Sequence, residues 1–251
     1  MGDFFGKTVL VTGGSRGLGR AMCLGFARSG AIPIVVSRKQ EACDRVAAEI
    51  RDRGGQAHAL AAHIGKTEEI DKLMMQIREL CTGVDILVNN AGINIAIAPL
   101  ETLTPAAFDK MYQVNLLGPW YLSTKVASLM RERSSGGSII NMLSVSALKP
   151  PSNMGFYAAT KAGLEALTKT MAQEWAPHDI RVNAVAPGSF RSDMLQQAID
   201  DHPHYETGMI NATSLKRIAC TDEIINPVFY LASEKNTTGI TLVSDGGYLM
   251  N

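Results

Sequence analysis

The 251-residue chain has no net charge, few aromatic residues and no long hydrophobic run. Its 24 Lys and Arg balance its 24 Asp and Glu, which argues against a main role in binding nucleic acid or an anionic membrane surface. Only 19% of the residues are charged whereas 46% are hydrophobic, so a large core can form, and disordered and fibrous classes are excluded.

Cysteine is also scarce. The four cysteines lie far apart without a Cys-x-x-Cys pair, which favours reduced thiols over a disulfide framework or a zinc site: Cys23, Cys43, Cys81 and Cys220. No stretch reaches 18 apolar residues, and the first residues lack the basic and apolar segments of a secretory signal. We therefore expect a cytoplasmic protein without a membrane span.

Short β-branched runs alternate with longer segments of helical period. The runs are 8–11, 32–36, 57–61, 86–88, 138–141, 181–185 and 241–243, and the helical segments are 18–29, 40–53, 67–81, 105–132, 156–175 and 222–232. Nearly continuous apolar strands that alternate with helices predict an α/β fold, a Rossmann-type doubly wound parallel sheet with helices on both faces. Because no linker or repeat interrupts the pattern, residues 1–251 are expected to form a single domain.

One long segment lacks a clear period. Residues 188–220 follow a predicted strand and carry Pro203, Gly208 and two histidines, His202 and His204. Long irregular segments in compact domains are usually functional, so we expect this one to cover the substrate. The two histidines lack companion ligands at metal-site spacing, and no metal site is predicted.

A glycine-rich motif, TGGSRGLG at 12–19, stands between the first predicted strand and the first predicted helix. A diphosphate needs backbone N–H donors and a positive helix end, and Gly13, Gly17 and Gly19 remove the Cβ atoms that would crowd it. The motif therefore predicts a dinucleotide site at 13–19, and the alternative is an ordinary glycine-rich turn.

The end of the second predicted strand indicates which dinucleotide binds. An acidic residue there usually meets a free 2′-hydroxyl, whereas this chain has Ser37 followed by Arg38. Arg38 can bind a 2′-phosphate through charge-assisted hydrogen bonds, and Arg16 can bind the same phosphate. Residues 1–60 carry a net charge of +4, offset by −4 in the remainder. These features favour NADP(H) over NAD(H), unless Arg38 is merely a solvated charge at a helix entry.

A third group of residues is Ser144, Tyr157 and Lys161. Positions i and i+4 share one face of a helix, so the phenol and the ammonium can point into one cleft. A Lys ammonium about 4 Å from a phenolate lowers the phenol pKa by up to roughly three units. Tyr157 is thus a candidate general acid and base, the alternative being a packed Tyr and a surface Lys.

Together these motifs resemble the short-chain dehydrogenase/reductase family over essentially the whole chain. The features are TGGSRGLG, Asn89-Asn90-Ala91-Gly92, Asn115, Ser144 thirteen residues before Tyr157, Tyr157-x-x-x-Lys161 and Pro187-Gly188. The resemblance implies that Tyr157 exchanges a proton with the substrate oxygen and that Ser144 hydrogen-bonds it. Lys161 would bind the nicotinamide ribose and lower the Tyr157 pKa, and Asn115 would complete a proton relay through water.

The resemblance also implies a cofactor site. Its residues would be Gly13, Ser15, Arg16, Gly17, Leu18, Gly19, Ser37, Arg38, His63, Ile64, Asn90, Ala91, Gly92, Tyr157, Lys161, Pro187, Gly188, Phe190 and Ser192. Many members have an Asp that contacts the adenine amino group where this chain has His63, so the adenine contact is left open.

We therefore expect an NADP(H)-dependent oxidoreductase that acts on a small carbonyl compound or secondary alcohol, as a carbonyl reductase or alcohol dehydrogenase. One alternative is a 3-oxoacyl-[acyl-carrier-protein] reductase. Members of that branch have a basic residue directly before a Glu of the helix at 156–175, whereas this chain has Gln173 before Glu174, which argues against the alternative. The other is a non-catalytic NADP-sensing scaffold. Members commonly pair the helix at 156–175 and the preceding one across subunits, so a homotetramer or homodimer is expected.

Overall fold

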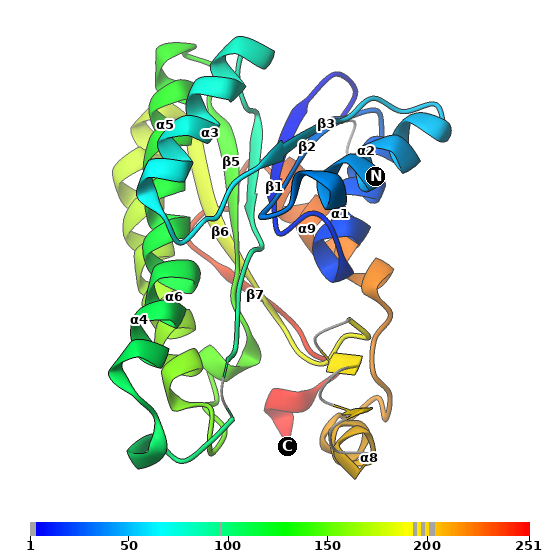
Figure 1. Cartoon of the computed structure of the whole chain (residues 1–251), viewed down its shortest axis with the longest axis vertical. Coiled ribbons are helices and arrows are strands. Elements are labelled where there is room, and N and C mark those ends of the chain that lie inside the picture. Colours follow the sequence, from blue (N-terminus) through cyan, green and yellow to red (C-terminus); the bar gives the residue numbers. More distant parts are fainter. Residues whose placement is uncertain (1–3, 96, 193–194, 197–198, 201–203) are drawn as a thin grey trace.

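The computed structural model describes residues 4–95, 97–192, 195–196, 199–200 and 204–251. Its centre is a seven-stranded parallel sheet in the order β3-β2-β1-β4-β5-β6-β7 (Figure 1). The strands are β1 (Thr8–Thr12), β2 (Ile32–Ser37), β3 (His58–Ala61), β4 (Ile86–Asn89), β5 (Gly137–Met142), β6 (Ile180–Pro187) and β7 (Thr241–Ser244). The order reverses between β1 and β4, so the sheet is doubly wound.

Helices cover both faces of this sheet. They are α1 (Gly17–Arg28), α2 (Gln40–Asp52), α3 (Thr67–Leu80), α4 (Pro105–Tyr112), α5 (Gly118–Glu132), α6 (Gly155–Trp175), α8 (His204–Ala212) and α9 (Ile225–Ser233). In Figure 1, α3, α5 and α6 lie on one side of the sheet and α1, α2 and α9 on the other.

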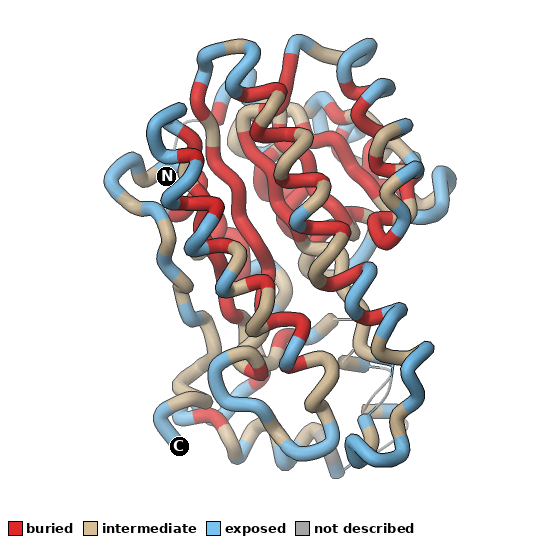
Figure 2. Tube along the Cα trace, turned by 90° about the vertical axis from the view of Figure 1, so that its left-hand side faces the viewer, coloured by how far each residue is buried: buried red, intermediate tan, exposed pale blue. Residues whose placement is uncertain are grey.

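Side-chain alternation along the strands divides the core in two. Val9 and Val11 of β1 pack into the cluster with α1, α2 and α9, whereas Leu10 between them packs into the cluster with α3, α5 and α6. All three are fully buried. Figure 2 shows the result, with buried strands inside and exposed residues on the outer sides of the helices. A strand buried on both faces must be apolar throughout, which is why β1 has no polar-apolar alternation.

The predicted α/β fold is confirmed, and each predicted strand lies within two residues of an observed one. The prediction of one continuous helix over 105–132 is wrong. The segment divides into α4, a π-helical turn (Gln113–Leu117) and α5, and the turn contains the fully buried Asn115. π-helical turns inside helices occur frequently at functional sites, and they leave no periodicity signal in the sequence.

The segment 188–220 is not irregular throughout, because it contains α8. Gly208 lies inside this helix, and the sequence of α8, HYETGMINA, has no apolar stripe that would have predicted it. His202 lies outside the described residues, and His204 begins α8. Among the described residues, no helix is long and apolar enough to cross a membrane.

Candidate active site

The glycine loop after β1 has the geometry of an anion site. Gly13 and Gly17 adopt positive φ angles of 65° and 52°, and a Cβ on Gly19 would lie 2.1 Å from the carbonyl oxygen of Gly13. Helix α1 begins at Gly17 without a side-chain cap and without an acidic residue in its first turn. Its first N–H groups are therefore available to an anion such as a dinucleotide diphosphate, and the loop, which also contains Ser15 and Leu18, fits this group.

The carboxyl end of β4 braces this loop. The backbone N–H groups of Asn90 and Ala91 both donate to Oγ1 of Thr12, each over 3.0 Å, and Nδ2 of Asn90 donates to the Thr12 carbonyl oxygen over 2.9 Å. Asn90 is one of the residues expected at the cofactor, and in the structure its amide group supports the glycine loop.

The other end of the site lies where β2 and β3 finish side by side. Ser37 is the last residue of β2, and its carbonyl oxygen accepts the N–H of Ala62, directly before His63. Arg16 and Arg38 are exposed, and neither guanidinium has a hydrogen-bond or ion-pair partner in the described part of the chain. Two unpaired cations near an open edge fit a phosphate on the adenosine ribose.

His63 is held in one tautomer. Its Nδ1 accepts the backbone N–H of Gly65 over 3.1 Å, so the proton of the neutral ring lies on Nε2. Its own backbone N–H donates to Oε2 of Glu69 over 2.7 Å. The free ring atom of His63 is thus a donor, whereas the Asp common in the family is an acceptor. Ile64, the next residue, is buried.

Strand β5 and helix α6 bring the predicted catalytic residues together. Ser144 follows the end of β5, and Tyr157 and Lys161 lie one turn apart on α6. The ammonium of Lys161 is almost completely buried, donates to the carbonyl oxygen of Met142 over 2.7 Å, and lies 5.9 Å from the centroid of the Tyr157 ring. The alternative of a surface lysine is therefore wrong.

The electrostatics differ from the expectation that Lys161 lowers the pKa of Tyr157. Burial raises the pKa of Tyr157, and the group that opposes this shift is the hydroxyl of Ser144 through a hydrogen bond. Burial also lowers the pKa of Lys161 to about 8. In the structure, desolvation by the surrounding protein is the largest cause of the pKa shift of both groups.

The π-helical turn places Asn115 next to Lys161. Oδ1 of Asn115 accepts the N–H of Ile93 over 2.8 Å, and Nδ2 donates to the Ile93 carbonyl oxygen over 2.8 Å and to Oγ1 of Thr160 over 3.2 Å. A Cβ on Gly92 would lie 3.3 Å from Nζ of Lys161 and 3.5 Å from Oδ1 of Asn115. Asn115, Lys161 and Gly92 therefore share one small volume.

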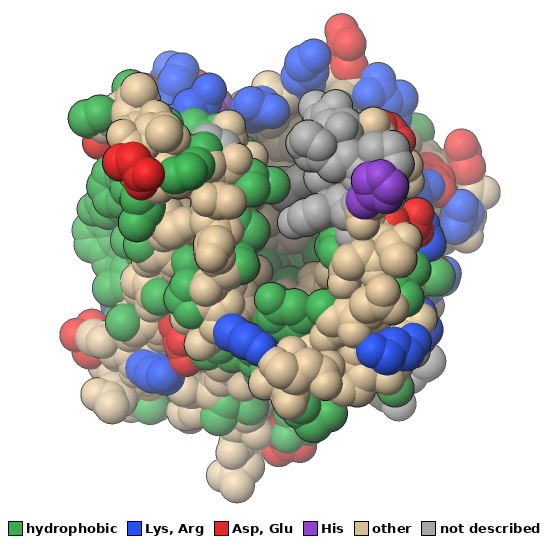
Figure 3. All heavy atoms as spheres, turned by 90° about the horizontal axis from the view of Figure 1, so that it is seen from below, with side chains coloured by type: hydrophobic (Ala, Val, Ile, Leu, Met, Phe, Trp, Pro, Cys, Tyr) green, Lys and Arg blue, Asp and Glu red, His purple; other side chains and the backbone are tan. Residues whose placement is uncertain are grey.

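The carboxyl end of β6 completes the site. β6 ends at Pro187, the Gly188 N–H donates to the Ser244 carbonyl oxygen over 2.9 Å, and a Cβ on Gly17 would lie 3.5 Å from Cβ of Ser192. The segment after β6 thus returns to the glycine loop. Seen from below, this face of the molecule is hollowed near its centre and partly lined by hydrophobic side chains (Figure 3).

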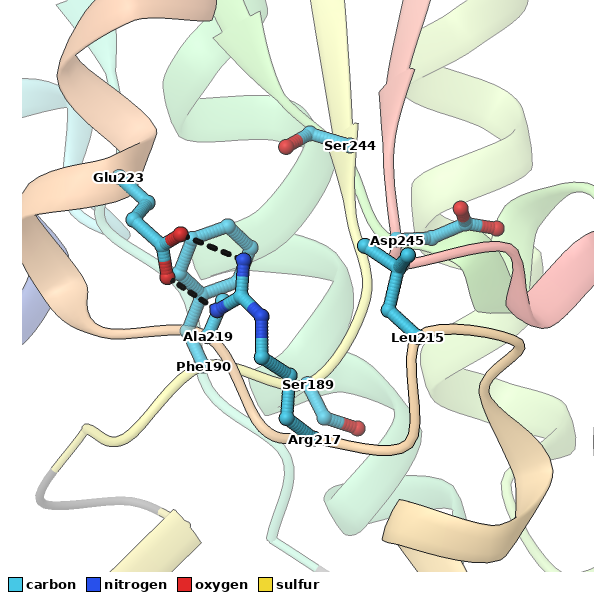
Figure 4. A pocket seen from close by; sticks show the side chains of 9 residues that line it. Ser189, Phe190, Leu215, Arg217, Ala219, Glu223, Ser244 and Asp245 are labelled. Atoms are coloured by element: carbon cyan, nitrogen blue, oxygen red, sulfur yellow. Dashed lines mark hydrogen bonds and ion pairs between the residues drawn. The ribbon is translucent and has the colours of Figure 1, made fainter.

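Phe190 differs from the other residues expected at the cofactor. Its side chain is buried in the core beside α1 and α9, and it lines a small pocket of about 130 Å³. Arg217 and Glu223 form a bidentate ion pair in this pocket, with N–O distances of 2.7 Å (Figure 4). This leaves the backbone of Phe190 as the part available to a cofactor.

Ser146 is the residue that the sequence reasoning missed. Its hydroxyl lies 3.0 Å from that of Ser144, and its backbone N–H donates to Oγ of Ser144 over 3.1 Å. The only sequence signal is a second serine two positions after the first. Among the described residues, no group of three or more His, Cys, Asp or Glu side chains is arranged to hold a metal ion.

Comparison with known proteins identifies the family. The model of the short chain dehydrogenase family matches residues 7–203. The chain belongs to this family. It is 35% identical over 243 residues to dehydrogenase/reductase SDR family member 4 of Sus scrofa, covering 96% of this chain and 86% of the relative. It is 36% identical over 251 residues to the 3-oxoacyl-[acyl-carrier-protein] reductase of Staphylococcus epidermidis, with 97% and 99% covered.

Solved structures agree with this assignment. A gluconate 5-dehydrogenase from Burkholderia cenocepacia, solved with NADP and tartrate, superposes with a TM-score of 0.93 at 31% identity, over 98% of this chain and 96% of that one. The protein is thus a short-chain dehydrogenase/reductase with a Rossmann-like fold, and the three relatives named above are dehydrogenases or reductases.

Proposed function

We propose that this short-chain dehydrogenase is an NADP(H)-dependent oxidoreductase that interconverts a carbonyl compound and a secondary alcohol, as a carbonyl reductase or alcohol dehydrogenase. The observation that carries the proposal is the convergence of Ser144, Tyr157, Lys161 and Asn115 at one end of the sheet, next to a glycine loop that fits a diphosphate. The chain acts as one catalytic unit, with residues 188–220 covering the substrate.

The side chains divide the proton chemistry between them. In reduction, the Tyr157 hydroxyl gives its proton to the substrate oxygen, and Ser144 donates a hydrogen bond to the same oxygen. Because Lys161 is held by the Met142 carbonyl oxygen, its remaining N–H groups can meet a ribose hydroxyl and return a proton toward Tyr157. Asn115 holds the backbone of Ile93 and orders the volume beside Lys161 through which a water would relay that proton.

The bound nicotinamide supplies or accepts the hydride. The residues that would hold the cofactor are those of the glycine loop for the diphosphate, Arg16, Ser37 and Arg38 for the 2′-phosphate, and His63 and Ile64 for the adenine. Asn90, Ala91 and Gly92 would line the adenosine-ribose side of the site, and Pro187, Gly188, Ser192 and the backbone of Phe190 would flank the nicotinamide. The unpaired guanidinium groups of Arg16 and Arg38 support NADP(H) over NAD(H).

The second candidate is a 3-oxoacyl-[acyl-carrier-protein] reductase, which the identity to the Staphylococcus epidermidis enzyme favours. The exposed residues at the expected carrier-docking position are Gln173 and Glu174. A carrier protein presents a phosphate group and an acidic surface, and neither an uncharged nor an acidic side chain attracts these. A non-catalytic NADP-sensing scaffold is disfavoured because it would not need a serine, a tyrosine and a lysine gathered at one site.

A substrate panel tests the proposal. The purified protein is mixed with NADPH or NADH and with simple ketones, 3-oxoacyl thioesters, keto sugars or steroids, and cofactor absorbance is followed. We expect faster oxidation of NADPH with at least one simple carbonyl class than with 3-oxoacyl thioesters. Preference for NADH would contradict the cofactor assignment, whereas NADPH binding without turnover on any carbonyl would favour the scaffold.

We also propose a cytoplasmic homotetramer or homodimer that pairs through α5 and α6. A groove of about 420 Å³ lies between these helices, lined by Trp120, Thr124, Arg131, Leu167, Thr170, Met171, Glu174 and Trp175. Trp120 is 39% exposed there, so part of its indole ring is open to a partner. A second copy of the same face supplies matching apolar area and opposite charges.

A further inference from the structure

Two serines share the turn that follows β5. Ser144 caps the 3₁₀ turn η3 (Val145–Ala147), and its Oγ accepts the backbone N–H of Ser146 over 3.1 Å. The hydroxyl of Ser146 lies 3.0 Å from the same Oγ and is only 5% exposed. In the described part of the chain, the Ser146 hydroxyl has no other hydrogen-bond partner.

The direction of the bond between the hydroxyls follows from counting protons. A hydroxyl has one proton to donate and two lone pairs to accept with. In the proposed reaction Ser144 must use its proton on the substrate oxygen, so it cannot donate to Ser146. The proton between the two oxygens therefore comes from Ser146. One lone pair of Ser144 then accepts the Ser146 N–H, and the other accepts the Ser146 O–H.

We propose that Ser146 is a positioning residue, which fills both acceptor sites of Ser144 Oγ so that Ser144 acts only as a donor toward the reacting oxygen. The inference rests on the proposed function. Filling the acceptor sites also polarises the Ser144 hydroxyl, because hydrogen bonds in a chain strengthen one another.

Without the Ser146 hydroxyl, one lone pair of Ser144 is free. The Tyr157 hydroxyl can then donate to it, since a hydrogen bond with Ser144 already affects the pKa of Tyr157. Tyr157 would then give its proton to Ser144 in a resting hydrogen bond instead of presenting it to the substrate. Ser146 prevents this competing arrangement.

The test compares Ser146→Ala with Ser138→Ala. Ser138 is also a buried serine, but it lies at the opposite end of β5, where its hydroxyl donates to the Leu231 carbonyl oxygen that Arg181 also bonds. We expect Ser146→Ala to lower kcat roughly ten-fold without changing the Kd for NADPH, because one neutral hydrogen bond is lost. Ser138→Ala keeps the wild-type kcat, and Ser146→Thr, which retains a hydroxyl, keeps most of it.

The pH profile separates positioning from loss of structure. In Ser146→Ala the apparent pKa of Tyr157 in the kcat profile should rise, because the freed acceptor site of Ser144 accepts the Tyr157 hydroxyl and so stabilises the protonated phenol. Lys161, the charged group that faces Tyr157 among the described residues, is present in both proteins. A kcat within two-fold of wild type, or a ten-fold loss with an unshifted profile, would overturn the inference. A wild type without carbonyl turnover would instead refute the proposed function.

Discussion

The ammonium group of Lys161 donates a hydrogen bond to the carbonyl oxygen of Met142, 2.7 Å away. Met142 is the last residue of β5 and stands two residues before Ser144. The strand that carries the serine therefore also anchors the lysine of the neighbouring helix. The position of Ser144 relative to Lys161 is fixed by the end of one strand, and any shift of β5 moves both groups together.

The burial of Lys161 should cost stability. Its pKa is about 8 in the folded protein against 10.5 for an ordinary lysine, a difference of about 3 kcal/mol. Below pH 8 the side chain is charged in both states and the cost is complete; between pH 8 and 10.5 only the unfolded state is charged, and the cost falls as pH rises. Lys161→Met should therefore be inactive but more stable than wild type at pH 7.

Chemical denaturation of both proteins without cofactor measures this effect. The free energy of unfolding of the wild type relative to Lys161→Met should rise between pH 8 and 10.5. A flat difference across this range would mean that the buried ammonium is not destabilising.

Arg38 should decide the choice of cofactor. Arg38→Asp removes a cation that can hold a 2′-phosphate and adds an acceptor for a free 2′-hydroxyl, so the ratio of the Kd for NADPH to that for NADH should rise by roughly 30-fold or more. Fluorescence titration measures both constants. Lys72→Asp, which makes the same charge change at an exposed position of α3, serves as the control. Equal ratios in the two variants would place the 2′-phosphate elsewhere.

His63 should make the site tolerant of the purine 6-substituent. Because Nε2–H can only donate, it can bond a ring nitrogen of adenine or the 6-oxo oxygen of hypoxanthine but cannot accept from a 6-amino group. Hypoxanthine-containing NADPH should bind within about three-fold of NADPH. In His63→Asp the adenine form should be favoured by roughly ten-fold. A wild type that already favours adenine ten-fold would exclude His63 as the adenine contact.

Trp120 tests the proposed subunit interface. Trp120→Glu introduces a charge at the α5–α6 groove and should convert the assembly to a smaller species in light scattering after size-exclusion chromatography. Met75→Glu, a change of the same kind at a 64% exposed position of α3, should leave the mass unchanged. If the wild type and both variants have the same molecular mass, the interface lies elsewhere on the surface.

Local residue patterns predicted most of the fold. The runs around Val9, Ile34 and Leu87 are apolar on both faces, as a doubly covered parallel strand must be, so their order predicted the sheet. The π-helical turn at Asn115 was not predictable, since one widened turn leaves the helical residue preferences unchanged.

The candidate site was predictable in its residues but not in its electrostatics. Motif spacing placed Ser144, Tyr157 and Lys161 together. The pKa shifts of Tyr157 and Lys161 depend on how many atoms surround each group, which only the packed structure gives. The tautomer of His63 and the partner hydroxyl of Ser144 likewise depend on the turn geometry of neighbouring residues.

The decisive measurement is that of kcat and the Kd for NADPH on one preparation of Tyr157→Phe. Removing the phenolic hydroxyl removes the proposed proton donor but leaves the glycine loop, Arg38 and Lys161 in place. We expect a loss of kcat of about 1,000-fold with a Kd for NADPH within about two-fold of wild type. Turnover near the wild-type rate would contradict the role of Tyr157 as the proton donor.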